Sequence, residues 1–79
     1  MAFYLIIDKM SEDDLVAIYR FTGDGGRTGS FQIDKESGDV SLVEPMPGDE
    51  QGHAFNRAAV KIMRAWKQGS LPVRAEWAS

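Results

Sequence analysis

The strongest pattern in the chain is an apolar stripe at helical spacing near its C-terminal end. Within residues 52–68, apolar residues fall at i, i+3, i+4, i+7, i+8 and i+11, namely Phe55, Ala58, Ala59, Ile62, Met63 and Trp66. This spacing places all six on one face of an α-helix. Asp49 is the predicted N-cap and Gly69 the predicted C-terminal stop. A helix that is apolar on one side needs a second layer, so the stripe predicts a layered fold.

The segments before this helix are predicted to supply the second layer. Short runs that either alternate or concentrate β-branched and aromatic residues predict strands at 3–8, 15–22, 29–34 and 39–44. The phrases GDGG and KESG between them predict tight turns, and the polar residues 9–14 predict a connection. The predicted fold class is α+β, in which a small antiparallel meander of four strands packs against one C-terminal amphipathic helix. We expect one domain spanning residues 1–79.

Two segments are compatible with more than one conformation. Ser11 and Asp14 resemble a helix capping box ahead of residues 15–22, although the Val, Ile, Tyr, Phe and Thr residues of that segment favour a strand. Residues 71–77 alternate and could form a fifth strand or an extended tail. Pro72 would confine such a strand to a sheet edge or to the beginning of the strand.

The predicted core combines one face of each strand with the helical stripe. The apolar runs of the first two strands do not determine which of their faces points inward. The expected inward set is Leu5, Ile7, Ile18, Phe31, Ile33, Val40, Leu42, Phe55, Ala59, Ile62, Met63 and Trp66.

One phrase of the predicted meander resembles a known repeat. Residues 31–45, FQIDKESGDVSLVEP, resemble repeats of larger extracellular adhesion domains, which also join an Ile-Asp pair, a turn glycine and an apolar strand. The phrase covers about a fifth of the chain. Any tight hairpin uses the same residues, so the resemblance implies a hairpin and no function.

The residue inventory argues against catalysis. The 79 residues contain no cysteine and one histidine, His53, whereas a structural zinc site needs about four nitrogen or sulfur ligands. The loop GDGGRTG at 23–29 lacks the Lys-Ser/Thr pair and the following helix of a phosphate-binding loop. The acidic run Glu12–Asp13–Asp14 lacks the spaced ligands of a calcium loop. We therefore predict no metal, no cofactor and no enzymatic activity.

Charge is distributed unevenly along the chain and suggests where a partner binds. Residues 1–50 carry eleven Asp or Glu against four Lys or Arg, a net of −7, and residues 51–79 carry one against five, a net of +4. The candidate partner-binding residues are four basic side chains opposite the apolar stripe and a C-terminal tryptophan of the kind enriched at interfaces, namely Arg57, Lys61, Arg64, Lys67 and Trp77.

These features predict a non-catalytic protein-interaction module such as an adaptor, an inhibitor or an immunity-type protein. The alternative is a nucleic-acid-associated module that uses the basic helix face, which the net charge of −3 disfavours. A homodimer through an open sheet edge is compatible with both. The chain shows no signal peptide and no run of ~20 apolar residues, so we expect a cytoplasmic protein that does not enter a membrane.

Overall fold

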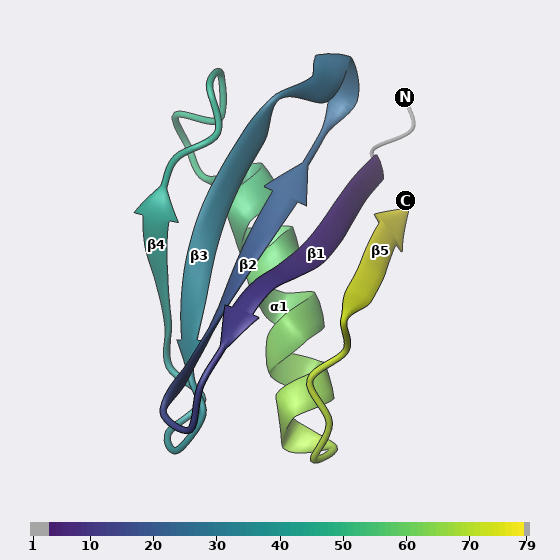
Figure 1. Cartoon of the computed structure of the whole chain (residues 1–79). Helices are drawn as coiled ribbons and strands as arrows, with labels where there is room; N and C mark the ends of the chain where they lie inside the picture. Colours follow the sequence, from purple (N-terminus) through teal and green to yellow (C-terminus); the bar gives the residue numbers. More distant parts are fainter. Residues whose placement is uncertain (1–3, 79) are drawn as a thin grey trace.

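The computed structural model describes residues 4–78 and consists of a twisted antiparallel sheet with one helix across one of its faces (Figure 1). Within these residues the sheet has five strands in the order β4-β3-β2-β1-β5. The α+β fold class predicted from the sequence is confirmed. The elements are β1 (Tyr4–Glu12), β2 (Val16–Thr22), a short 3-10 turn (Asp24–Gly26), β3 (Thr28–Asp34), β4 (Val40–Glu44), α1 (His53–Lys67) and β5 (Arg74–Ala78).

The segment after the helix forms the fifth strand. β5 returns along β1 in antiparallel register, with Leu5 opposite Trp77 and Ile7 opposite Ala75. Pro72 precedes the strand, where its missing N–H disturbs no ladder. The first strand of the chain therefore lies inside the sheet, and the two edges are β4 and β5.

The first hairpin resolves the ambiguous segment as a strand. β2 pairs with β1 on one side and with β3 on the other. No helix follows the capping-box residues Ser11 and Asp14. The neighbouring Asp13 closes the turn between the strands instead, because its Oδ1 accepts the N–H groups of Leu15 and Val16 at 2.8 Å. The connection predicted at 9–14 is wrong in its first part. β1 continues to Glu12 through a register irregularity between Lys9 and Ser11, because β2 is long enough to pair with it.

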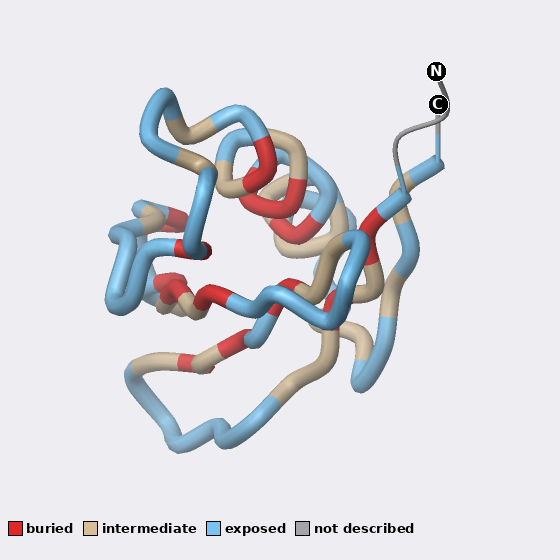
Figure 2. The backbone as a smooth tube through the Cα atoms, turned by 90° about the horizontal axis from the view of Figure 1, so that it is seen from above, coloured by how far each residue is buried: buried red, intermediate tan, exposed pale blue. Residues whose placement is uncertain are grey.

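The hydrophobic core lies between α1 and the sheet (Figure 2). Its aromatic centre places the rings of Tyr19 and Phe31 5.8 Å apart, with Phe21 and Phe55 each about 6 Å from Phe31. Such pairs stabilise a core beyond the area that they bury. The buried cluster comprises Leu5, Ile7, Ala17, Tyr19, Phe21, Phe31, Ile33, Met46, Ala54, Ala58 and Ile62.

Two residues of the predicted inward set do not belong to this core. Ile18 lies on the open face of the sheet, because the phase of β2 buries Ala17, Tyr19 and Phe21 instead. Leu42 is opposite Phe31 and so faces the helix side, but its position on an edge strand leaves it 42% exposed. Both faces of β2 carry apolar residues, so periodicity alone could not determine which face of that strand points inward.

The ends of α1 follow the predicted signals with one change of geometry. Asp49 is not the N-cap residue itself, since Gly52 occupies that position, yet its carboxylate accepts the N–H groups of Ala54 and Phe55 at 3.0 and 3.1 Å. At the other end Gly69, with φ +89°, allows two backbone bonds that close the last turn. Within residues 4–78, no helix combines the length and the apolar character needed to cross a membrane.

Candidate functional site

The solvent side of α1 carries the basic residues predicted from the sequence. Lys61, Arg64 and Lys67 are exposed, while Arg57 is half-buried and donates from its guanidinium to the backbone oxygen of His53 at 3.2 Å. We call these four residues the basic face. They span eleven residues, whose ten rises of an α-helix make about 15 Å. The helix contains no Asp or Glu.

Three residues of this face, Lys61, Arg64 and Lys67, form no ion pair with the described residues. Among the described residues, the ion pairs join Lys9 and Lys35 to Glu12, and Arg74 to Asp8. The end of the helix that carries Arg64 and Lys67 is the negative end of its dipole, which stabilises them there in the absence of a counter-ion.

Apolar side chains lie among these cations. Val60 is 38% exposed, because its position on α1 points away from the sheet. Together with Met63 it lines a shallow depression whose remaining walls are Arg64 and Lys67. A partner residue placed here would meet apolar contact surface and positive charge together. This mixture is typical of protein-binding surfaces.

Trp77 is not part of this face. It lies on β5 on the helix side of the sheet, half-buried and packed against the core. Its indole Nε1 is buried and has no hydrogen-bond partner within residues 4–78. The structure thus brings the four basic residues together along one helix and separates them from the fifth predicted site residue.

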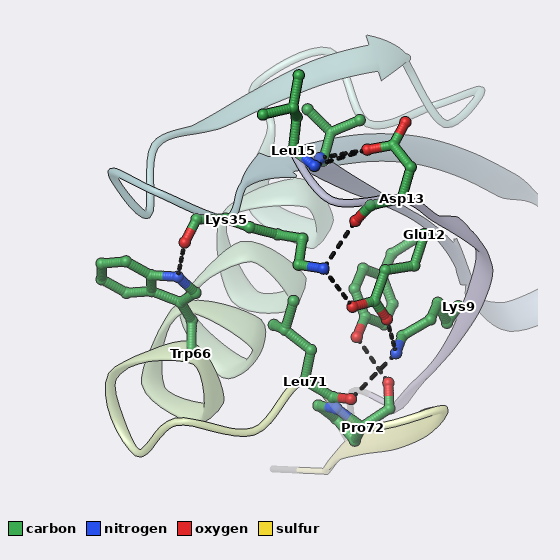
Figure 3. A network of polar contacts seen from close by, with 10 residues as sticks. Lys9, Glu12, Asp13, Leu15, Lys35, Trp66, Leu71 and Pro72 are labelled. Atoms are coloured by element: carbon green, nitrogen blue, oxygen red, sulfur yellow. Dashed lines mark hydrogen bonds and ion pairs between the residues drawn. The ribbon is translucent and has the colours of Figure 1, made fainter.

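A second candidate site is a polar network drawn from close by in Figure 3. It lies beside the last turns of α1, at the end of the molecule that carries the β1–β2 hairpin (Figure 1). The Glu12 carboxylate lies between two lysines: Oε2 is 2.7 Å from Lys35 Nζ, and Oε1 accepts from Lys9 Nζ. These two hydrogen bonds, that of Lys35 first, lower the pKa of Glu12 to about 2. Lys9 Nζ also donates to the backbone oxygen of Leu71 at 3.1 Å, and Lys35 Nζ donates to that of Asp13 at 2.7 Å.

Two aromatic side chains extend this network to the segments around it. The Tyr19 hydroxyl donates to the backbone oxygen of Pro72 at 2.6 Å, and burial raises its pKa to about 12. The Trp66 indole donates to the backbone oxygen of Lys35 at 2.8 Å. We call this group, with Glu12 at its centre, the Glu12 network. It joins the β1–β2 hairpin, the β3–β4 turn and the segment after α1.

The Glu12 network has the chemistry of a structural connection. The adjoining pocket, of about 330 Å³, is near the lower limit for a small-molecule site. Its charged groups already bond one another, and a carboxylate with a pKa of about 2 is a weak base at neutral pH. His53 begins α1, whereas the network adjoins the last turns of the helix, so the two cannot act together.

The other residues considered from the sequence have local roles. The loop at 23–29 closes the β2–β3 hairpin through a bond from Gly23 N–H to the oxygen of Arg27, at 2.9 Å. Glu12 pairs with lysines, and Asp13 accepts hydrogen bonds from backbone amides. In the described part of the chain, no three acidic, histidine or cysteine side chains are arranged to hold a metal ion.

The Glu12 network was not anticipated from the sequence. Lys9 and Glu12 are three residues apart, but they fall in a segment predicted as a connection. Lys35 and Leu71 lie far along the chain, and only the tertiary fold brings them to the same carboxylate. Comparisons of the chain with protein-family models, curated proteins and solved structures find no match.

Proposed function

We propose that this protein is a non-catalytic binding module and that the basic face of α1 docks an acidic surface of a protein partner. The observation that carries the proposal is the exposure of Lys61, Arg64 and Lys67, none of which forms an ion pair with the described residues. These cations lie around the apolar side chains of Val60 and Met63.

The combination of charge and apolar surface favours a protein over a nucleic acid. Binding to a phosphate backbone depends on summed positive charge, whereas this chain has a net charge of −3 and its residues 1–50 alone carry −7. The aromatic residues of α1, Phe55 and Trp66, pack against the core and cannot stack on bases. An acidic amphipathic helix would match both the cations and the Val60–Met63 depression.

A titration followed by NMR tests the proposal. The probe is a synthetic helical peptide that alternates Glu and Leu on one face, added to the ¹⁵N-labelled protein. We expect the amide signals of residues 57–67 to shift, and Arg64→Glu to weaken binding roughly tenfold or more, because it replaces an attraction with a repulsion. Absence of any shift at 57–67 would refute the proposal.

Arg20→Glu is the matched control. Arg20 is exposed on the open face of the sheet, and its reversal changes the net charge by the same amount as that of Arg64. Equal weakening by both variants would show that overall charge attracts the peptide and that the basic face is not its site. Duplex and single-stranded oligonucleotides form a second arm. If they bind tighter than the peptide, with affinity that falls steeply as salt is added, the nucleic-acid alternative replaces the proposal.

A further inference from the structure

The outer edge of β5 has backbone groups that no described residue pairs with. Lys9 N–H donates to Val73 O at 2.8 Å, in the same register that places Asp8 opposite Arg74. Because the bonding direction alternates along an antiparallel strand, Val73, Ala75 and Trp77 direct their N–H and C=O groups toward β1. Arg74 and Glu76 therefore direct theirs away from the sheet, where β5 is the last strand.

The two edges of the sheet differ in how well they could accept another strand. β4 contains a register irregularity opposite Ser30 and Phe31 and leads directly into Pro45. Its only charged residue, Glu44, is acidic, as is Asp39 before it. These features discourage pairing at an edge. β5 pairs with β1 without irregularity and carries charges of both signs.

We propose that two copies of this chain pair through β5 in antiparallel orientation, with Ala75 of one copy opposite Ala75 of the other. This register places Arg74 opposite Glu76 of the second copy, and Glu76 opposite its Arg74. All four residues direct their backbone groups outward, so each pair exchanges two ladder hydrogen bonds. Their side chains lie on the open face of the sheet, and opposite charges directly across a ladder stabilise it.

Charge selects this register over its neighbours. A shift by two positions places either Arg74 opposite Arg74 or Glu76 opposite Glu76, which is destabilising. A shift by one position sets outward-directed groups against inward-directed ones and exchanges the faces of the strand. The sequence Arg-Ala-Glu is thus complementary to itself only when the two-fold axis passes between the two Ala75 residues.

The same register covers an exposed apolar side chain. Val73 is 74% exposed, the highest value among the large apolar residues that the structure describes. In the dimer it lies opposite Trp77 of the second copy, in a non-hydrogen-bonded pair whose Cα atoms are about 4.5 Å apart. Trp77, which the sequence marked as an interface residue, would then contact a partner along the sheet.

The two-fold axis of this pairing is perpendicular to the sheet. It joins the two sheets into one and places both α1 helices on the same side of it. A dimer would therefore present two basic faces toward one partner. The pairing itself rests on β5 alone and does not depend on the function proposed for α1.

Charge exchange between positions 74 and 76 tests both the dimer and its register by sedimentation velocity. We expect the wild type to dimerise, and Arg74→Glu or Glu76→Arg to weaken the dimer roughly tenfold or more, since each turns two attractions into two repulsions. An equimolar mixture of the two single variants should form a heterodimer, and the double variant R74E/E76R should recover the homodimer. Wild type that stays monomeric up to about 1 mM overturns the proposal.

Two further variants distinguish the interface from effects on folding. Glu76→Pro removes an N–H that points away from β1 and a carboxylate that accepts an exposed hydrogen bond from the Tyr4 hydroxyl at 2.6 Å. It leaves the β1–β5 ladder intact, so the monomer should keep its circular dichroism spectrum while dimerisation is lost. Arg64→Glu on α1 should leave the dimer intact. A dimer that survives Glu76→Pro, or a double variant R74E/E76R that fails to recover pairing while folded, shows that β5 is not the interface.

Discussion

Replacement of Gly38 by alanine is a sharp test of how the helix packs on the β3–β4 turn. Gly38 is buried, has φ +80°, and lies under the ring of Trp66. A Cβ atom at this position would be 2.5 Å from Trp66 Cζ3 and 2.7 Å from Cε3. Alanine here therefore has two independent costs, one in the backbone and one against the indole.

The two costs can be worked out separately. The left-handed backbone conformation costs an alanine about 1–2 kcal/mol. The indole must also move, which breaks its 2.8 Å hydrogen bond to the oxygen of Lys35, at about 1 kcal/mol, and loosens its packing. We expect a total loss of about 2–4 kcal/mol, a large share of the roughly 4–12 kcal/mol expected for a domain of this size.

Urea denaturation followed by circular dichroism measures this loss, with Gly69→Ala as the matched control. Gly69 has φ +89° and no atom within 4 Å of an added Cβ, so its replacement carries only the backbone cost. Gly38→Ala should be the more destabilising by about 1–2 kcal/mol. The excess should vanish in a Trp66→Leu background. Equal losses for the two glycines would refute the packing described for Trp66.

Two further predictions concern the Glu12 network. Tyr19→Phe should lower the free energy of unfolding by about 1–2 kcal/mol, because it leaves the Pro72 oxygen unpaired, and urea denaturation measures it; an unchanged value would exclude that bond from the stability of the fold. Glu12 has a folded pKa of about 2, below its ordinary value of 4.5, so the stability that it contributes is present above pH 4.5 and is lost as the pH falls toward 2. The urea midpoint of Glu12→Gln should therefore change less over that interval than that of the wild type, and parallel profiles would contradict the pairing with Lys9 and Lys35.

The helix was predictable because its signals are local. The apolar stripe repeats within one segment, and Gly69 adjoins its end, so no distant residue is needed to recognise it. The basic face followed from the same periodicity, since residues opposite the stripe must point to solvent. Asp49 was identified as a cap, although the structure shows that it reaches the helix amides from three residues ahead of Gly52.

The strands were predictable in number more than in detail. Composition indicated β2 as a strand, but a run in which Ala17, Ile18 and Tyr19 are adjacent allows either face to be buried. The structure buries Ala17 and Tyr19, because those positions face α1 together with the inward residues of β1 and β3. Leu42 faces the expected side of the sheet, but it is exposed because β4 is an edge strand. Position within the sheet, which is absent from local patterns, determined both outcomes.

The sequence by itself determined one amphipathic helix, a set of short strands, and a basic surface on an acidic chain, because each depends on the spacing of neighbouring residues. Only the tertiary structure decided that β1 lies inside the sheet, that Lys35 and Glu12 meet, and that β5 has a free edge where Arg74 and Glu76 lie two positions apart. These features depend on which strands lie side by side. The residues that meet there are far apart in the sequence, so local patterns cannot indicate the order.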